Sequence, residues 1–234
     1  MKEVDVFDAT YTRHLGTAPL RQVYEEGLWH QSAHAWIFTS DEEIIFQLRS
    51  NDIVSYPNRL GVSAGGCVDV GDTPFETIIR ETQEELGLNI SDEKILSVGY
   101  RICQSSNEGR IYNVFDNLFL INHEAPLIEY NIQESEVGGV FAMSYADAAK
   151  FFNNEIDNVE LRGFTIENGE RKWRDIVARL DSFVPFKPYY YKHMLGIIGR
   201  MLNAKAHSYV FVGNMFQNYR KIMPVPMLIQ SEVI

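Results

Sequence analysis

The sequence predicts a fold of the α/β or α+β class, in which a mixed β-sheet is covered by helices. Short runs rich in β-branched and aromatic residues alternate along the chain with segments of helical spacing. Apolar residues make up 45% of the 234 residues and charged residues 23%, which is typical of a globular protein. Helices and strands that each have one apolar face are stable when they pack as layers, so a sandwich is expected.

The first predicted elements lie between residues 4 and 121. Val4–Thr10 alternates weakly and is a candidate strand, Ala18–Leu28 has the spacing of a helix, and Thr73–Leu86 is the clearest helix of the chain. The β-rich runs that predict further strands are His34–Thr39, Glu43–Leu48, Leu96–Gln104 and Ile111–Ile121.

Three more elements are predicted before residue 183. Val137–Met143 has the composition of a strand, and Tyr145–Phe152 is a predicted helix for which Ser144 is a suitable N-terminal cap. Glu170–Leu180 has apolar residues at helical spacing and is predicted to be an amphipathic helix.

The composition changes near residue 183, which divides the chain into a main domain, residues 1–182, and a C-terminal appendage, residues 183–234. Two prolines interrupt the chain there, Tyr189–Leu202 is a predicted helix, and Tyr209–Phe216 is rich in aromatic and β-branched residues. The appendage is too apolar for a solvated tail. Its expected role is to pack on the main domain or to form a homodimer contact, without taking part in the chemistry.

The net charge of −11 limits the classes of partner. A strongly acidic chain repels a polyanion, so no nucleic-acid partner is expected. A small anionic substrate remains compatible with this charge if metal ions supply positive charge at the site.

No membrane partner is expected, because no apolar run approaches the ~20 residues that a membrane-spanning helix needs. The N-terminus, MKEVDVFDAT, has acidic residues where a secretory signal would have a basic end and an apolar stretch. The two cysteines, Cys67 and Cys103, cannot form a disulfide framework. A cytoplasmic location is therefore expected.

The ends of the Thr73–Leu86 helix are specified locally. Thr73 is a good N-cap, Pro74 suits the first helical position, and Glu76 completes a Thr-x-x-Glu capping box. Gly87 is placed to end the helix.

One face of this helix carries three carboxylates. At about 100° per residue, Glu81, Glu84 and Glu85 share a single arc, separate from the apolar stripe. Carboxylates three or four residues apart repel one another by roughly 0.2–0.5 kcal/mol per pair. A solvated acidic surface is the simplest explanation. The Gly65-Gly66 sequence that leads into the helix favours a metal site, because glycines let the backbone approach a ligand and Mg²⁺ prefers carboxylate oxygens.

The segment resembles the Nudix box, Gly-x5-Glu-x7-Arg-Glu-U-x-Glu-Glu-x-Gly-U, where U is a bulky aliphatic residue. The matching residues, with every spacing intact, are Gly66, Asp72, Arg80, Glu81, Thr82, Glu84, Glu85, Gly87 and Leu88. Asp72 replaces the first glutamate and shortens its reach, and Thr82 replaces the aliphatic residue. Neither departure removes a principal metal ligand.

The resemblance implies a Nudix-type α/β/α sandwich that hydrolyses a phosphoanhydride bond of a small diphosphate. It assigns Glu81, Glu84 and Glu85, with the carbonyl of Gly65, to the binding of Mg²⁺ or Mn²⁺ cofactor ions. Such cations activate water and stabilise charge on the phosphoryl oxygens.

By the same resemblance, Arg80 orients the glutamates through ion pairs and Asp72 is a supporting carboxylate. A further carboxylate is expected from a loop outside the box, for which Glu136 is the first choice and Glu134 the second. An exposed acidic loop explains either residue equally well.

A wider pattern resembles the Nudix proteins related to isopentenyl diphosphate isomerase. It consists of His30, His34, Trp36, Gln47, Arg49, Tyr56, Pro57 and Ser63 to Gly66. This resemblance, which extends over roughly residues 1–180, places His30 and His34 near the substrate and gives Arg49 a phosphate to hold. Packing of the two histidines beside Trp36, and a surface position for Arg49, are the structural alternatives.

Two other functions fit the same fold. The isomerase needs a catalytic cysteine, whose position here is Gly65, and later glutamates, which align with Tyr112 and Val114. Cys67 falls where the isomerase has a metal-binding histidine. A non-catalytic sensor of nucleotide sugars usually loses glutamates of the box, which are intact here. Hydrolysis is therefore predicted, with a nucleoside diphosphate derivative or an isoprenoid diphosphate as substrate.

Overall fold

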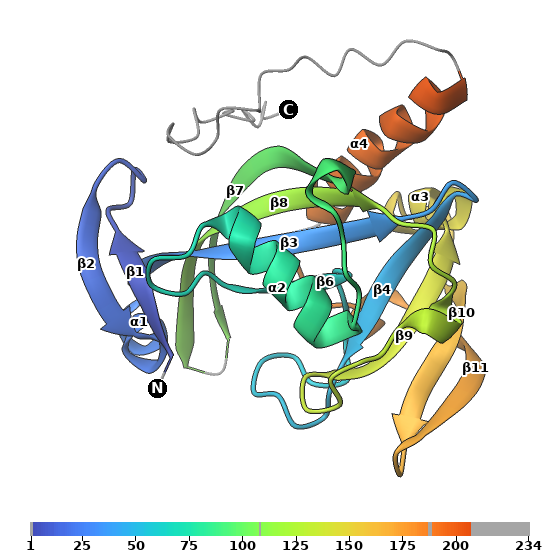
Figure 1. Cartoon of the computed structure of the whole chain (residues 1–234), viewed down its shortest axis with the longest axis horizontal. Coiled ribbons are helices and arrows are strands. Elements are labelled where there is room, and N and C mark those ends of the chain that lie inside the picture. The colour runs from blue at the N-terminus through green and yellow to red at the C-terminus, as the bar shows by residue number, and fades with distance from the viewer. Residues whose placement is uncertain (1, 108, 187–188, 207–234) are drawn as a thin grey trace.

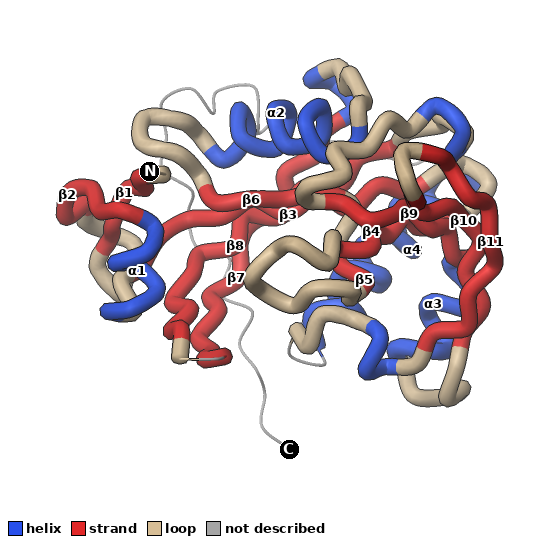
Figure 2. Tube along the Cα trace, turned by 90° about the horizontal axis from the view of Figure 1, so that it is seen from below, coloured by secondary structure: helices blue, strands red, loops and turns tan. Residues whose placement is uncertain are grey.

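The fold is a mixed sheet with helices on both faces, as Figures 1 and 2 show. The computed structural model describes residues 2–107, 109–186 and 189–206. The predicted α/β class is confirmed, and so is the presence of a helix beginning at residue 189. The predicted element at Tyr209–Phe216 lies outside the described residues.

In the part of the chain that the structure describes, the sheet has eleven strands, with a main order of β11-β10-β9-β4-β3-β1-β2. The strands are β1 (Glu3–Phe7), β2 (His14–Pro19), β3 (Trp29–Phe38), β4 (Glu43–Arg49), β5 (Leu60–Gly61), β6 (Ala64–Cys67), β7 (Ile95–Asn107), β8 (Arg110–Asn122), β9 (Val137–Ser144), β10 (Val159–Glu167) and β11 (Glu170–Ala178). β7 pairs with β8, and β5 pairs with β4.

β3 is the central strand of the site. It pairs in parallel with β8 along its whole length and antiparallel with the short β6 along its middle, from Ser32 to Ala35. Side chains alternate between the two faces of a strand. Ala33 and Ala35 therefore belong to the core on one face, whereas Trp36 belongs to the core on the other. His34 projects to the same face as Trp36.

The two faces of the sheet are covered by different helices. α2 (Pro74–Leu86) covers one face, and α3 (Tyr145–Phe152) and α4 (Tyr189–Ala206) cover the other (Figure 2). α1 (Leu20–Glu26) lies beside the hairpin of β1 and β2 (Figure 1). Within the described residues, three short 3-10 helices lie in the connections: η1 (Asp92–Lys94), η2 (Leu127–Glu129) and η3 (Leu180–Ser182). In the described ranges, no helix is both long and apolar enough to cross a membrane.

The helix predicted at Glu170–Leu180 is wrong, because most of this segment forms the strand β11. β11 pairs with β10 in an antiparallel hairpin that extends from Glu167↔Glu170 to Val159↔Ala178. Asn168 and Gly169 both have positive φ values, 55° and 76°, as the turn of a tight hairpin requires. The Asn-Gly pair was the local signal for this hairpin, and the helical spacing after it was coincidental.

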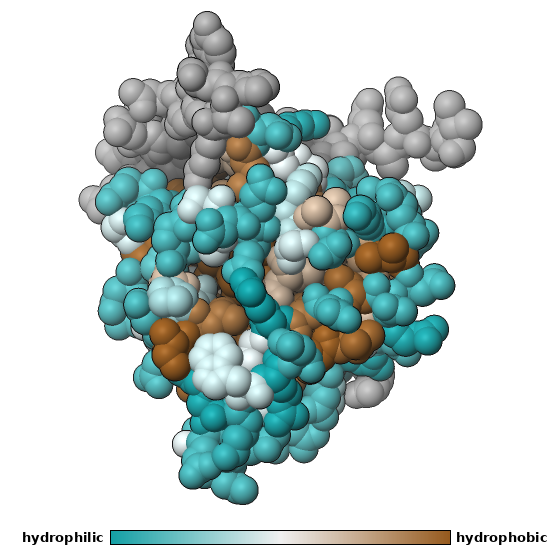
Figure 3. All heavy atoms as spheres, turned by 90° about the vertical axis from the view of Figure 1, so that its right-hand side faces the viewer, coloured by the Kyte–Doolittle hydropathy of each residue, from teal (hydrophilic) through white to brown (hydrophobic). Residues whose placement is uncertain are grey.

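β11 forms one edge of the sheet, and its side of the molecule carries exposed apolar side chains. Trp173 is 54% exposed and Val177 is 65% exposed. In Figure 3, which faces this side, brown apolar patches lie among hydrophilic side chains. A hollow of about 400 Å³ lies between β10, β11 and the loop around Leu127. None of the residues predicted for the functional site lines it.

The described part of the segment after residue 182 packs into the core on the α4 face. Phe183, Tyr191, Leu195 and Ile198 are buried in one cluster with residues of β3, β4 and β9. The ring of Tyr191 stacks on Phe152 of α3 with 4.3 Å between the centroids. The apolar residues of α4 are therefore covered by the protein's own sheet and helix α3. A homodimer contact by residues 183–234 stays a prediction.

Replacing Leu195 by alanine should lower the free energy of unfolding by about 2–5 kcal/mol, because the side chain is 3% exposed and its loss leaves a cavity. Leu180→Ala is the matched control, since this leucine is 56% exposed and its replacement should change stability by less than about 0.5 kcal/mol. Urea denaturation measures both. Equal effects of the two variants would contradict the packing of α4.

Candidate functional site

The helix α2 begins and ends where its local sequence predicts. The Thr73 side chain accepts a hydrogen bond from the N–H of Glu76, and the Glu76 carboxylate accepts one from the N–H of Thr73. Gly87 ends the helix in the left-handed conformation, with φ of 70°. Thr82, which departs from the box, donates its hydroxyl to the carbonyl of Ile78 and so needs no other partner. The glutamates are thus presented by a helix with well-defined ends.

The three glutamates of α2 differ in their surroundings. Glu81 and Glu85 are buried, with 5% and 4% of their surface exposed. The side chain of Glu84 is 52% exposed. The helix therefore directs two carboxylates inward, toward β6, and leaves the third at the surface.

The glycines of β6 make room for the two buried carboxylates. The N–H of Gly65 donates to Oε2 of Glu85 at 2.8 Å. It therefore points away from β3, and in an antiparallel pair the carbonyl of the same residue points to the same side. A Cβ at Gly66 would lie 2.4 Å from Oε1 of Glu81, so only glycine allows this contact.

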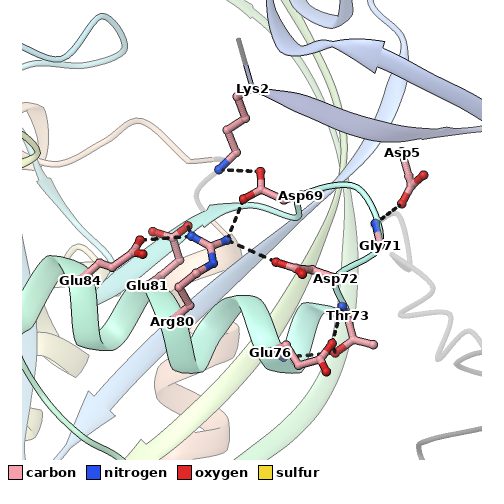
Figure 4. Close-up of polar contacts among 10 residues, drawn as sticks. All are labelled: Lys2, Asp5, Asp69, Gly71, Asp72, Thr73, Glu76, Arg80, Glu81 and Glu84. Atoms are coloured by element: carbon pink, nitrogen blue, oxygen red, sulfur yellow. Dashed lines mark hydrogen bonds and ion pairs between the residues drawn. The ribbon is translucent and has the colours of Figure 1, made fainter.

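The Arg80 side chain lies between acidic side chains of α2 and of the loop that precedes it (Figure 4). Its Nη1 donates to Glu81 at 3.0 Å and to Glu84 at 3.2 Å. Its Nη2 lies 3.1 Å from Asp69 and 3.7 Å from Asp72. One guanidinium thus offsets part of the repulsion among four carboxylates.

The N-terminal strand holds the loop that precedes α2. Lys2 forms an ion pair with Asp69 at 3.1 Å, and the N–H of Gly71 donates to Asp5 (Figure 4). Val4 also pairs with Asp69 through the backbone. Asp69 therefore links the N-terminus to Arg80.

Burial dominates the electrostatics of the two inward glutamates. Burial, together with the charges of Glu81 and Glu136, raises the pKa of Glu85 to about 8, although the Gly65 N–H and Arg49 act against this. Burial also raises the pKa of Glu81, against the opposing charges of Arg80 and Lys2. Carboxylates crowded together in a poorly solvated place favour binding a proton or a cation.

The oxygen atoms of these carboxylates and of the Gly65 carbonyl are chemically suitable ligands for a hard divalent cation. Carboxylate oxygens and a backbone carbonyl are the ligands that Mg²⁺ and Mn²⁺ prefer. In the described parts of the chain, no three acidic, histidine or cysteine side chains converge on one point at metal-binding geometry. Arg80 draws Glu84 toward itself, and Glu85 is bonded to Gly65.

Of the two carboxylates predicted in the loop outside the helix, Glu136 has a resolved effect on the buried residues. Its charge acts on Glu81, Glu85 and Arg49. The N–H of Ser50, next to Arg49, donates to the carbonyl of Glu136 and fixes this loop to the end of β4.

Arg49 lies beside the same carboxylates. Its Nε donates to the carbonyl of Ser55 at 3.0 Å, and the hydroxyl of Ser55 contacts that of Tyr112 at 2.8 Å. The loop between β4 and β5 is thereby connected to β8. Burial lowers the pKa of Arg49, and the charges of Glu85 and Glu136 oppose this effect.

His34 belongs to a buried polar cluster on the α4 face. Its Nδ1 lies 2.9 Å from the hydroxyl of Tyr190, and its Nε2 lies 3.8 Å from Asp116. Asp116 also accepts hydrogen bonds from Arg101 at 2.7 Å and from Ser32. Burial, with Arg101, lowers the pKa of His34 to about 4 despite Asp116, so the ring is neutral at pH 7.

His30 has different surroundings from His34. Its Nδ1 lies 3.2 Å from the carbonyl of Leu28, and its ring packs edge-on against Tyr24 of α1. Only 1% of its surface is exposed. This histidine closes the core at the start of β3.

Comparison with known proteins identifies the family. A model of the NUDIX domain matches residues 28–161, which include β3, β6 and α2. The chain belongs to the Nudix family. It is an enzyme, a hydrolase that acts on diphosphates.

Relatives of the Nudix chain are found among bacteria and plants. It is 29% identical over 197 residues to an uncharacterised Nudix hydrolase of Clostridium acetobutylicum, which covers 82% of this chain and 94% of the relative. It is 32% identical over 143 residues to Nudix hydrolase 3 of Arabidopsis thaliana, covering 58% of this chain and 18% of that protein.

A crystal structure of a Deinococcus radiodurans protein, DR0079, has a similar fold. Its TM-score is 0.52 at 17% identity, and the match covers 65% of this chain and 90% of that one. At this identity the likeness bears on the fold alone.

Several polar residues of this Nudix site were missed by sequence reasoning. Asp69 is the easiest of them to identify from the sequence, because it lies within the box, between Gly66 and Asp72. Asp116 and Arg101 lie on apolar strands, where a polar residue gives no sign of its partners. Lys2 and Tyr190 are brought in from the two ends of the described chain, and no local pattern marks them.

In metal-free buffer, Glu85→Gln should raise the melting temperature at about pH 9 and leave it nearly unchanged at about pH 5. The folded pKa of Glu85 is about 8, above its ordinary 4.5, so folding takes up a proton and the glutamate destabilises the protein as pH rises from about 4.5 through about 8. Glutamine removes this effect and still accepts from Gly65.

Differential scanning fluorimetry with EDTA measures the difference. Glu84→Gln is the control, because its exposed side chain pays little for burial and its replacement should change stability by less than about 0.5 kcal/mol. A Glu85→Gln melting temperature equal to that of the wild type at both pH values would disprove the raised pKa.

Proposed function

We propose that this Nudix hydrolase depends on Mg²⁺ or Mn²⁺ and cleaves the phosphoanhydride bond of a small diphosphate metabolite. The observation that carries the proposal is the burial of Glu81 and Glu85 against the glycines of β6. Two carboxylates in a poorly solvated place are unfavourable unless they bind cations or protons. A solvated acidic surface, the simple alternative, does not explain their burial.

In this proposal Glu81, Glu84, Glu85 and the carbonyl of Gly65 hold the cations, which supply charge neutralisation at the phosphoryl oxygens and a more acidic water. Arg80 holds Glu81 and Glu84 in place through its ion pairs. These residues therefore act by placing oxygen ligands, and none of them is a nucleophile.

The chemical step is the attack of water on one phosphorus of the diphosphate. The water oxygen forms a bond to this phosphorus, and the bond to the bridging oxygen breaks with its electron pair. The second phosphate leaves with that oxygen, and one proton of the water passes to a carboxylate or to solvent. Glu136 is the proposed acceptor, since it is exposed and its charge acts on Glu85 and Arg49.

Arg49 is the proposed ligand of a phosphoryl oxygen. No ion pair involves its guanidinium among the described residues, and Ser55 fixes its position through Nε. A planar guanidinium held in this way suits two-point recognition of a phosphate. These contacts do not distinguish a nucleoside from an isoprenoid as the group attached to the diphosphate.

The isomerase alternative lacks its proton-transfer residues. Gly65 occupies the cysteine position, and Cys67 contacts the hydroxyl of Tyr24 at 3.3 Å. Tyr112, at a position of the later glutamates, is bonded to Ser55, and Val114 is buried. The intact glutamates also favour hydrolysis over a non-catalytic nucleotide-sugar sensor.

Turnover should require the glutamates of α2. Assays of a panel of nucleoside and isoprenoid diphosphates with Mg²⁺ or Mn²⁺ should give phosphate-containing products with at least one compound. Glu85→Gln and Glu84→Gln should each lower kcat by about 100-fold or more, because each removes a negatively charged cation ligand without loss of bulk. Glu134→Gln, the matched control in the exposed loop, should keep wild-type kcat. Wild-type kcat in both helix variants would refute the assignment.

The Cys67→Ala variant distinguishes a hydrolase from an isomerase. Cys67→Ala should keep hydrolytic kcat within about threefold, because the nucleophile is water. Wild-type protein incubated with isopentenyl diphosphate should form none of its allylic isomer by NMR. Appearance of the isomer in the wild type, with loss of that conversion in Cys67→Ala, would replace the hydrolase by an isomerase.

A further inference from the structure

Tyr190 of α4 joins two residues of β3 through its hydroxyl group. Nε1 of Trp36 donates to this hydroxyl at 2.9 Å, and Nδ1 of His34 lies 2.9 Å from it. An indole N–H can only donate, and a tyrosine hydroxyl has one proton to give. The oxygen of Tyr190 therefore accepts from Trp36. Among the described contacts, Nδ1 of His34 is the one acceptor for the Tyr190 proton, and the carboxylate of Asp116 on the Nε2 side of the ring favours a hydrogen there, so the hydroxyl donates to Nδ1.

This arrangement determines the tautomer of His34. Nδ1 accepts the proton of Tyr190, so the hydrogen of the neutral ring must be on Nε2. The Nε2–H is directed to the side of Asp116, but 3.8 Å is too long for a hydrogen bond. Asp116 is already bonded to Arg101 and Ser32. The Nε2–H of His34 is thus a fixed donor that lacks a close acceptor among the described residues.

The donor lies next to the proposed diphosphate site. His34 pairs across the strands with Gly65, and the N–H of Gly65 holds Glu85. A Cβ on Gly65 would lie 3.2 Å from the ring of His34. The charge of Arg49, the proposed phosphate ligand, acts on both His34 and Glu85.

Tyr190 also contacts Arg101, a positively charged side chain of the same polar cluster as His34. The guanidinium carbon of Arg101 lies 3.9 Å from the centroid of the Tyr190 ring and 4.7 Å from that of Phe186. Contacts of this kind stabilise a cation over an aromatic face. The same tyrosine therefore sets the positions of His34 and Arg101.

We propose that Tyr190 is a positioning residue of the active site: it holds His34 so that its Nε2–H donates to a phosphoryl oxygen of the substrate. Tyr190 is 156 residues from His34 in the chain. With this role, helix α4 contributes to the active site as well as to the core. This inference rests on the proposed function, because it requires a bound diphosphate.

Tyr191 provides a matched control for Tyr190. It is the next residue of α4, is 3% exposed compared with 5% for Tyr190, and donates its hydroxyl to the carbonyl of Val184. Tyr190→Phe and Tyr191→Phe each remove one buried hydroxyl from the same helix. Only the first change reaches His34.

The test uses the full chain, Mg²⁺ and methylenediphosphonate, a diphosphate that cannot be hydrolysed. Calorimetry should show weaker binding of this probe by Tyr190→Phe, roughly 3- to 10-fold, because one oriented donor is lost. Tyr191→Phe should bind within about twofold of the wild type. Long-range ¹H–¹⁵N NMR should show the Nε2–H tautomer of His34 in the wild type and in Tyr191→Phe, and a mixture of tautomers in Tyr190→Phe.

An Nδ1–H tautomer in the wild type would overturn the proposal, and this result needs no variant if Tyr190→Phe does not fold. Equal binding of the probe by the two variants would also overturn it, as would absence of binding to the wild type. The panel of hydrolysis assays reports separately on the proposed function, because the tautomer is measured without turnover. A protein that shows the expected tautomers and binding but hydrolyses no diphosphate would retain this role of Tyr190 and lose the hydrolase assignment.

Discussion

The carboxylates of Glu81 and Glu85 lie against the backbone of β6, and the geometry of the candidate site depends on this contact. The contact needs glycine at residue 66, where a Cβ would meet Glu81, and an N–H at residue 65 that is not used by β3. Burial there raises the pKa of both glutamates. The fold thus keeps two acidic groups where a cation or a proton is needed to offset their mutual repulsion.

The charge around this contact is balanced by residues from outside the helix face. Arg80 connects Glu81 and Glu84 to Asp69, and Asp69 in turn pairs with Lys2 (Figure 4). The pairs at the surface each contribute little to stability, because water and salt screen them. Their consequence is geometric, because they connect the N-terminal strand and the glycine-rich loop to α2.

The opposite face of the sheet combines packing with polar recognition. Tyr191 and Leu195 of α4 lie in the apolar core, and Tyr190 of the same helix contacts His34 and Arg101. A helix that is fixed by its apolar side chains is a rigid support for a hydrogen-bond donor. In the proposed role of Tyr190, the described part of this segment serves both the core and the active site.

The sequence by itself determined the boundaries of α2 and the shared face of its glutamates, because caps and helical periodicity act over a few residues. It also determined most strands and the family, through a box of intact spacing. The packing of α2 against β6 decided which carboxylates are buried. Glu81 and Glu85 lie against β6, whereas the Glu84 side chain is exposed to solvent. The pairing of β11 with β10, and the meeting of Tyr190 with His34, depend on contacts between segments whose local patterns do not refer to each other. Long-range packing selects such contacts, so only the tertiary structure decided them.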